Sequence, residues 1–405
     1  MTRSAAQWAS PPRLPEDHYV NSLVYTDPGV FAQEREKIFA RTWKFVCHES
    51  ELPSPGDFRS LEHAGIPIVV VRGHDGLVRA FFNACSHRGA QLVTEPRGNA
   101  RHFTCFFHLW SYDGMGRCIE ITREDGYDQC GLGKNDCGLR SVRTAEKLGL
   151  IFINLDDDAP AFDSYAGNAL DDLIEPMGTR PMEVFHYHRV PMKANWKQWH
   201  ETNMELYHEW GHVVNRTTSV AAGGYHERKW KIHPNGHGSL DPLKVEYENY
   251  KGWDGRQDLL LPGLSQGEFR VVDIFPNTTV IIRGTTVRID TSIPIAPGIT
   301  LLEQRGLGIK GESAEDRAVR QEHHNQFWGP FGRNLAEDVI FVEAVERTNR
   351  HGASRYGIIA RHEDLMSQDD EIVRAYYRVW GKYMGVSAAK PLGKGAPCEP
   401  LLETA

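Results

Sequence analysis

The sequence predicts an α+β protein of two domains, a small antiparallel β domain and a larger domain of helices with a second antiparallel sheet. Between residues 44 and 157, short apolar runs of strand length alternate with turn sequences such as Gly-His-Asp-Gly at 73–76. A second group of apolar β runs lies between residues 269 and 307, with helical segments before and after it. With 405 residues, 40% of them hydrophobic, the chain is long enough to fill two cores.

Composition excludes several classes of protein. A net charge of −8, with charges of both signs mixed along the chain, gives no basic surface for nucleic acid. The chain has no run of 18 apolar residues and no apolar leader segment at its start, so we expect a cytoplasmic protein that does not enter a membrane. In a reducing compartment, cysteines outside a metal site are expected to be free thiols, although Cys130 and Cys137 leave a second metal site open.

The first half of the chain divides into two parts. Residues 1–43 are predicted to form an arm and a helix from Asp27-Pro28 to about Trp43, with Asp27 as its cap and an apolar stripe at helical spacing. Residues 44–157 form the small β domain, ending in the acidic stretch at 156–160. Its strands are expected at 66–71, 78–82, 103–104, 109–112 and 148–155.

Residues 158–390 are predicted to form the second domain, followed by a tail at 391–405. A strand near 184–191 leads into a helix that begins at Asn195. Four strands of an antiparallel meander follow at 269–275, 278–283, 287–293 and 300–307, and then one long helical segment at 314–351.

Two Cys-His pairs stand in the first domain, Cys85-x-His87 and Cys105-x2-His108, with 17 residues between them. Two thiolates and two imidazoles suit a zinc ion or a Rieske [2Fe-2S] cluster. Each short loop supplies one ligand of each type, as the cluster requires, whereas zinc sites usually pair Cys with Cys and His with His. A chance match to this template has a probability of about 3 in 10,000. The order of ligands therefore favours iron and sulfur over a zinc-stabilised module.

A second group of metal-ligating residue types follows Asn195. On a helix Glu201, Glu205, His208 and His212 fall within about 60° of one another, opposite a side of Trp and Leu residues. A polar front and an apolar back also describe an ordinary surface helix, so the pattern alone leaves both interpretations open.

Together these residues resemble the Rieske non-haem iron oxygenases, the large subunits of aromatic-ring-hydroxylating dioxygenases and related monooxygenases and demethylases. The similarity extends to residues 82–83, 88–92, 110–114 and 195–197. It implies a Rieske [2Fe-2S] domain joined to a helix-grip catalytic domain, in which a curved antiparallel sheet wraps helices. The cluster ligands would be Cys85, His87, Cys105 and His108.

The resemblance also implies a mononuclear Fe(II) held by His208, His212 and a distant carboxylate, for which Asp338 matches and Glu337 is the alternative. Two His and one carboxylate on one face leave open positions for dioxygen and substrate. Glu205 would be the catalytic residue that links this iron to the cluster. Three departures from the usual pattern are Leu109 in place of Gly, Glu205 in place of Asp, and three rather than four residues between the two His.

No nicotinamide or flavin fingerprint is present, so the chain needs an NAD(P)H-dependent reductase, with or without a ferredoxin. The resemblance implies a homotrimer, alone or with a small β subunit, that hydroxylates an aromatic or related small organic substrate. Cis-dihydroxylation is favoured, and mono-oxygenation or demethylation is the alternative. A pure electron carrier needs only the first domain, and roughly 240 further residues argue against it.

Polar residues inside the second domain allow two interpretations. The arginines of the predicted strands either bind an anionic substrate or lie on the solvent face of a half-buried sheet, which is the favoured expectation. These are Arg270, Arg283, Arg288 and Arg305. His323 and His324 are expected to be structural or exposed.

Overall fold

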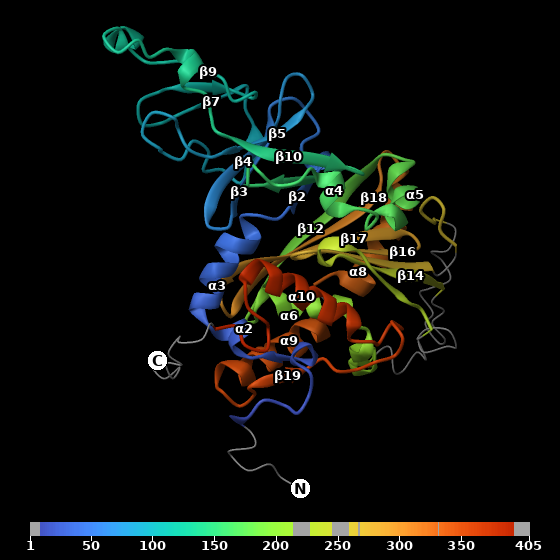
Figure 1. Cartoon of the computed structure of the whole chain (residues 1–405). Helices are drawn as coiled ribbons and strands as arrows, with labels where there is room; N and C mark the ends of the chain where they lie inside the picture. The colour runs from blue at the N-terminus through green and yellow to red at the C-terminus, as the bar shows by residue number, and fades with distance from the viewer. Residues whose placement is uncertain (1–8, 214–226, 245–258, 266–267, 331, 393–405) are drawn as a thin grey trace. The chain divides into compact units, whose positions relative to one another are not determined.

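The computed structural model describes residues 9–213, 227–244, 259–265, 268–330 and 332–392 (Figure 1). These residues form two compact units, Phe39–Pro160 and a larger one that combines Met1–Ile38 with Ala161–Ala405. None of the helices described is long and apolar enough to cross a membrane. The expected tail falls almost wholly on 393–405, which lies outside the described residues.

The smaller unit contains a seven-stranded antiparallel sheet in the order β2-β11-β10-β5-β4-β3-β6 and a three-stranded sheet β7-β8-β9. The strands are β2 (Lys44–His48), β3 (Asp57–His63), β4 (Ile66–Arg72), β5 (Val78–Phe82), β6 (Arg97–Asn99), β7 (His102–Thr104), β8 (Ser111–Asp113), β9 (Cys118–Glu120), β10 (Ser141–Lys147) and β11 (Leu150–Asn154). The predicted hairpin joins β4 to β5, with Gly76 at a φ of 83°. That positive φ is why the turn takes glycine.

Two apolar clusters lie on opposite sides of β4. Val69 and Val71 belong to the cluster that contains Cys85 and Cys105, while Ile68 and Val70 belong to the other. Neighbouring strand residues point to opposite faces, so an unbroken apolar run is buried on both. One face of β4 therefore packs in the same apolar cluster as the two cysteines.

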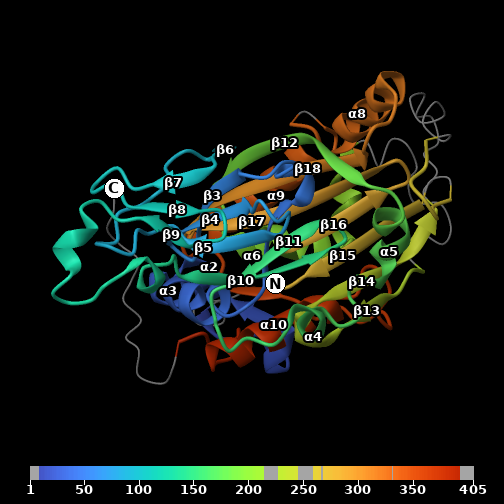
Figure 2. The same ribbon diagram turned by 90° about the horizontal axis from the view of Figure 1, so that it is seen from above.

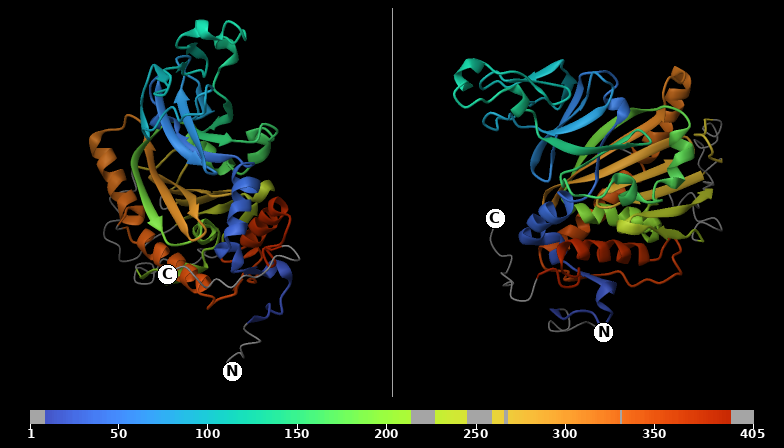
Figure 3. Two further views of the ribbon diagram at one scale, coloured as in Figure 1. Left: turned by 90° about the vertical axis from the view of Figure 1, so that its left-hand side faces the viewer. Right: turned by 45° about the horizontal axis from the view of Figure 1, so that its top comes forward.

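The larger unit is built on a seven-stranded antiparallel sheet in the order β12-β18-β17-β16-β15-β14-β13 (Figure 2). Its strands are β12 (Met182–Met192), β13 (Trp230–Ile232), β14 (Gly238–Lys244), β15 (Glu268–Ile274), β16 (Thr278–Arg283), β17 (Thr286–Ala296) and β18 (Ile299–Ile309), and β1 (Tyr19–Asn21) pairs separately with β19 (Tyr356–Ile358). The helices are α2 (Leu23–Thr26), α3 (Pro28–Glu34), α4 (Phe162–Ala166), α5 (Asp171–Gly178), α6 (Trp196–Met204), α8 (Ala314–Trp328), α9 (Leu335–Arg350) and α10 (Glu371–Met384). The sheet curves over α6, α9 and α10 (Figures 1 and 3). The predicted α+β class with a curved sheet on helices is confirmed.

Three helix predictions differ from the structure at their ends. The first helix is capped by Asp27, whose side chain accepts from Val30 N at 2.9 Å as expected, but it continues as a π-helix and stops at Phe39. The helix from Asn195 ends at Met204, and the long segment at 314–351 breaks into α8 and α9 at Gly329-Pro330. A proline restricts the residue before it to extended backbone, which explains the last break.

Candidate metal centres and substrate cavity

The two Cys-His loops have the same backbone geometry. Cys85 N donates to Ala90 O and Gly89 N donates to Cys85 O, both at 2.8 Å. In the second loop Cys105 N donates to Trp110 O at 2.8 Å and Leu109 N donates to Cys105 O at 2.9 Å. Leu109, with a φ of 60°, thus occupies the position that Gly89, with a φ of 74°, holds in the first loop.

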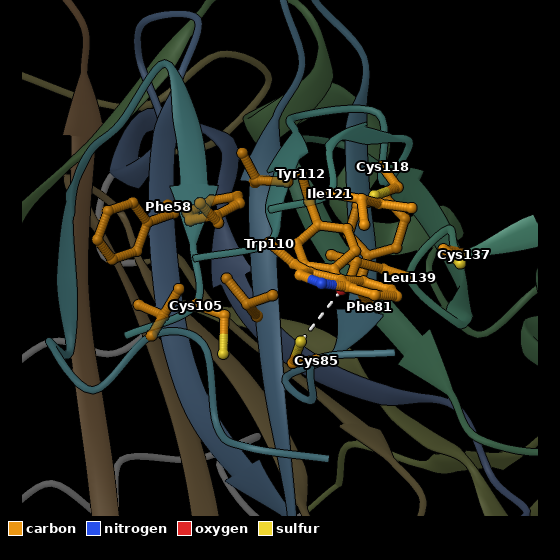
Figure 4. Close-up of a cluster of buried hydrophobic side chains, with 14 residues drawn as sticks. Phe58, Phe81, Cys85, Cys105, Trp110, Tyr112, Cys118, Ile121, Cys137 and Leu139 are labelled. Atoms are coloured by element: carbon orange, nitrogen blue, oxygen red, sulfur yellow. Dashed lines mark hydrogen bonds between the residues drawn. The ribbon is translucent and has the colours of Figure 1, made fainter. Parts of the chain in front are cut away.

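The four expected cluster ligands all lie in the smaller unit. Cys85 and Cys105 are buried against aromatic side chains, and Cys85 Sγ lies 3.1 Å from Tyr112 Oη (Figure 4). The ring centroids of His87 and His108 are 4.5 Å apart. Burial lowers the pKa of His87, and the neighbouring His108 lowers it further. Two buried thiols and two neighbouring imidazoles are the donor types that a Rieske cluster requires.

All six cysteines that the structure describes are free thiols. Within the described ranges, none of these cysteines belongs to a group of three or more side chains that could hold a single metal ion, the cluster candidates Cys85 and Cys105 included.

The larger unit brings His208, His212 and Asp338 together, with one ligand atom of each within 4.8 Å of the others. Asp338 Oδ1 lies 3.2 Å from His212 Nε2 and 3.5 Å from His208 Nε2. Asp338 stands in the first turn of α9, in the part of the predicted helical segment that follows the break.

The expectation that one continuous helix carries these histidines is wrong. Glu205 has extended backbone, with a φ of −123° and a ψ of 138°, and its side-chain Oε2 accepts from Tyr207 N at 2.6 Å and from His208 N at 3.2 Å. It therefore ends α6 and starts a short 3-10 helix, Tyr207–Gly211. Glu201, on the same predicted stripe, lies outside the group and accepts hydrogen bonds from Tyr25 and Tyr377.

Each histidine also donates a hydrogen bond to a second carboxylate, through the ring nitrogen that faces away from Asp338. His208 Nδ1 donates to Glu205 Oε1 at 2.8 Å, and His212 Nδ1 donates to Glu337 Oε2 at 2.7 Å. Because the Nδ1 atoms are occupied, both Nε2 atoms are directed at Asp338. Such outer hydrogen bonds fix ring orientation and tautomer at metal sites. Glu337 was expected only as an alternative ligand, and no spacing in the sequence indicates this supporting contact.

The carboxylates control the charge of these groups. Burial lowers the pKa of His208, but Glu205 and Asp338 outweigh it and raise that pKa well above its ordinary value. Burial raises the pKa of Asp338, and the close approach of His208 and His212 reverses the effect and holds that pKa well below its usual range. A site that concentrates negative charge in this way suits a cation.

A cavity lies beside the three residues and contains two of the arginines. Its lining includes His208, His212, Asp338, Arg283 and Arg288, together with Asn203, Glu209, Phe269 and Trp328. Arg283 and Arg288 are only 6% and 3% exposed, and Arg305 is fully buried, so the favoured expectation of solvent-facing arginines is wrong for these three.

His323 and His324 are buried as well, so an exposed position is excluded for them. Which face of a strand a helix will cover cannot be read from the strand alone.

Comparison with known proteins identifies the class. Residues 42–133 match the family described as Rieske [2Fe-2S] domain, and residues 179–384 match the ring hydroxylating alpha subunit (catalytic domain). The chain therefore belongs to the family of Rieske-type ring-hydroxylating oxygenases, as an alpha subunit. It has a Rieske [2Fe-2S] domain and a catalytic domain with a candidate mononuclear iron site.

Two relatives cover nearly the whole chain. The alpha subunit of 2-aminobenzenesulfonate 2,3-dioxygenase from Alcaligenes sp is 43% identical over 96% of this chain and 99% of its own length. The hydroxylase alpha subunit of methanesulfonate monooxygenase from Methylosulfonomonas methylovora is 39% identical over 96% of each chain. Both dioxygenases and monooxygenases are thus among its relatives.

Solved structures agree on the fold. Naphthalene 1,2-dioxygenase from Rhodococcus sp. has a TM-score of 0.77 at 20% identity, covering 90% of this chain and 94% of that one. A quaternary ammonium Rieske monooxygenase has a TM-score of 0.75 at 23% identity, covering 92% of this chain and 100% of that one.

Proposed function

We propose that the chain is a terminal oxygenase component that uses dioxygen, and electrons from a separate NAD(P)H-dependent reductase, to hydroxylate an aromatic or related small organic substrate. The reductase acts directly or through a ferredoxin. The observation that carries this is the convergence of His208, His212 and Asp338 beside a cavity. Three ligands on one face of an iron leave positions free for dioxygen and substrate.

The residues have distinct roles in this proposal. His208, His212 and Asp338 would hold the mononuclear Fe(II), and Cys85, His87, Cys105 and His108 would hold the cluster. Bound iron supplies dioxygen activation. Glu205 and Glu337 keep Nε2 of each histidine directed at the metal, and the buried cavity wall excludes water from the substrate.

We propose a homotrimer, alone or with a small β subunit, as the working assembly. Support comes from two exposed apolar surfaces that lie on separate units. Phe106, Phe107 and Leu109 are 74%, 55% and 55% exposed around His108, and Tyr207 and Trp210 are 54% and 47% exposed near Glu205. Apolar patches rimmed by polar residues mark interaction sites, and two different patches fit a head-to-tail contact that closes into a ring.

Cis-dihydroxylation is the favoured reaction, and 2-aminobenzenesulfonate is the first substrate to test because a relative named for it is 43% identical. The alternative is mono-oxygenation, which the 39% identical methanesulfonate monooxygenase supports. Turnover under isotopically labelled dioxygen with a supplied reductase separates the two, since a dioxygenase places both labelled atoms in the organic product and a monooxygenase places one. Metal analysis that finds zinc in place of iron would overturn the proposal in either form.

A further inference from the structure

The catalytic cavity holds two buried guanidinium groups that the metal site does not use. Arg283 and Arg288 both line it, together with His208, His212 and Asp338. Taking a charged side chain out of water is costly unless a partner compensates for it. Both guanidinium groups are placed where a ligand that enters the cavity could reach them.

Strand pairing places both side chains on the same face of the sheet. Arg283 on β16 pairs with Thr286 on β17, and Arg288 lies two residues further along β17. Diagonal neighbours of this kind are about 7–8 Å apart, within reach of long side chains. Both guanidiniums also lie near the ring of Trp328 on α8, at 5.7 Å for Arg283 and 5.2 Å for Arg288. Aromatic stacking of this type holds a guanidinium in a fixed plane.

The partners of Arg288 do not use all its donors. One terminal nitrogen lies 2.6 Å from Asp290 Oδ2 and 3.0 Å from Asn203 Oδ1. Among the residues that the structure describes, Arg288 Nε has no hydrogen-bond partner although it is buried. A buried donor without a partner in the cavity wall indicates a group that arrives from outside.

We propose that Arg283 and Arg288 form a subsite for the anionic group of the substrate, so that the enzyme selects small organic sulfonates or carboxylates over neutral compounds. Sulfonate and carboxylate oxygens accept the forked, charge-assisted hydrogen bonds that guanidinium donates. That the bound anion is a substrate rests on the proposed function. That the cavity binds an anion depends only on the two arginines.

The test is calorimetric titration of the iron-loaded, oxidised protein without reductase, using matched anionic and neutral probes. The pairs are benzenesulfonate with methyl phenyl sulfone, and methanesulfonate with dimethyl sulfone; benzoate with nitrobenzene provides the carboxylate arm. We expect at least one anion to bind about tenfold or more tightly than its neutral partner. Whether a sulfonate or benzoate binds more tightly then identifies the anionic group.

Variants assign the effect to the two arginines. Arg283→Gln and Arg288→Gln should each weaken binding of the preferred anion by about 10–100-fold and leave its neutral partner unchanged. The matched control is Arg270→Gln on β15, because Arg270 points to the opposite face, pairs with Glu268 and is absent from the cavity lining. It should bind both probes as the wild type does.

Equal binding of anion and neutral partner by the wild type in all three pairs overturns the inference, and this comparison stands even where a variant fails to fold. Equal weakening of both members of a pair in a folded Arg283→Gln also overturns it, because that result shows a structural role. Failure of the proposed function looks different. An anion that binds through Arg283 but is never oxygenated refutes the oxygenase and not the subsite, whereas oxygenation confined to neutral compounds refutes only the subsite.

Discussion

At the scale of single residues, neighbouring acids at the start of α9 contact opposite sides of one histidine ring. Asp338 Oδ1 lies 3.2 Å from His212 Nε2, and Glu337 Oε2 accepts from His212 Nδ1 at 2.7 Å. Successive positions on a helix are about 100° apart, so one residue can face the metal position while its neighbour supports the ligand from outside. The pair gives a direct test of which acid is the ligand.

We expect Asp338→Ala to lose the mononuclear iron and to keep the cluster spectrum, because the two donor sets share no residue. Glu337→Gln should retain that iron, with affinity reduced about 10–100-fold through the weakened support of His212. Iron content after dialysis against graded chelator, with visible circular dichroism of the cluster, measures both effects. Retention of iron by Asp338→Ala together with its loss from Glu337→Gln would reverse the assignment.

Leu109 is a second residue with a specific consequence. Its φ of 60° is in the left-handed region, where a side chain costs about 1–2 kcal/mol, and the equivalent position of the other loop is Gly89. We expect Leu109→Gly to stabilise the smaller unit by up to about 1 kcal/mol, since the greater freedom of glycine in the unfolded chain offsets part of the relief. Loss of the cluster's visible circular dichroism in urea reports the change.

The control for that prediction is Leu109→Ala, which removes the same exposed apolar atoms and keeps the backbone strain. Alanine should give no gain in stability. If alanine and glycine stabilise equally, then exposure of the leucine side chain rather than backbone conformation is responsible.

At the scale of helices and strands, the sequence predicted β5 and β16 residue for residue, but it did not predict where α6 ends. The spacing of Glu205, His208 and His212 predicts one helix face, but a turn followed by a 3-10 helix brings the same two histidines to Asp338. Glutamate is not a typical capping residue, so the side-chain bonds of Glu205 to Tyr207 N and His208 N left no recognisable signal. The buried arginines were missed because strand alternation shows two faces without showing which one the helices cover.

Helices α3, α6 and α10 meet at a buried ion pair. Glu34 Oε1 accepts from Lys197 Nζ and from Trp380 Nε1, each at 2.7 Å, and Oε2 accepts from Trp196 Nε1 at 3.0 Å. Both charged side chains are at most 1% exposed. Burial lowers the pKa of Lys197, and the charge of Glu34 opposes that shift. The pair connects the N-terminal segment to the helix that leads into the metal site.

Removing one partner of this pair should be strongly destabilising. We expect Lys197→Met to lower the free energy of unfolding by about 3–5 kcal/mol, because Glu34 is then left buried without its counter-charge. Adding Glu34→Gln should restore most of the loss. Urea unfolding followed by tryptophan fluorescence measures the change, since Trp196 and Trp380 both contact Glu34.

The exposed pair Lys229–Asp364 provides the control, because its side chains are 49% and 85% exposed. Lys229→Met should change stability by no more than about 1 kcal/mol. A Lys197→Met protein as stable as this control would show that the pair has no role in holding the three helices.

At the scale of the whole molecule, one chain carries two sets of iron donors and no fingerprint for collecting hydride itself. In the proposed function, electrons arrive from a separate reductase at the Rieske unit and continue to the catalytic unit. The exposed apolar surfaces around His108 and near Glu205 are where we propose that neighbouring protomers meet. In that assembly the carboxylate of Glu205 would accept hydrogen bonds from His208 of its own chain and from His108 of the neighbouring protomer.

The last prediction tests that link. Glu205 is superfluous as a metal ligand once Asp338 completes the set, yet its side chain makes three hydrogen bonds, one to His208 Nδ1 and two to backbone N–H groups. Glu205→Gln keeps the shape and loses the charge and one acceptor oxygen. We expect it to retain both metal centres and the oligomer while slowing single-turnover oxidation of the reduced protein by dioxygen and substrate about 10–100-fold. Glu205→Asp is the matched control, because it keeps the charge and both acceptor oxygens and should recover much of the rate.

Oxidation of Glu205→Gln at the wild-type rate would exclude the link. An equal slowing in both variants, with a lowered unfolding midpoint, would show that Glu205 only stabilises the start of the 3-10 helix.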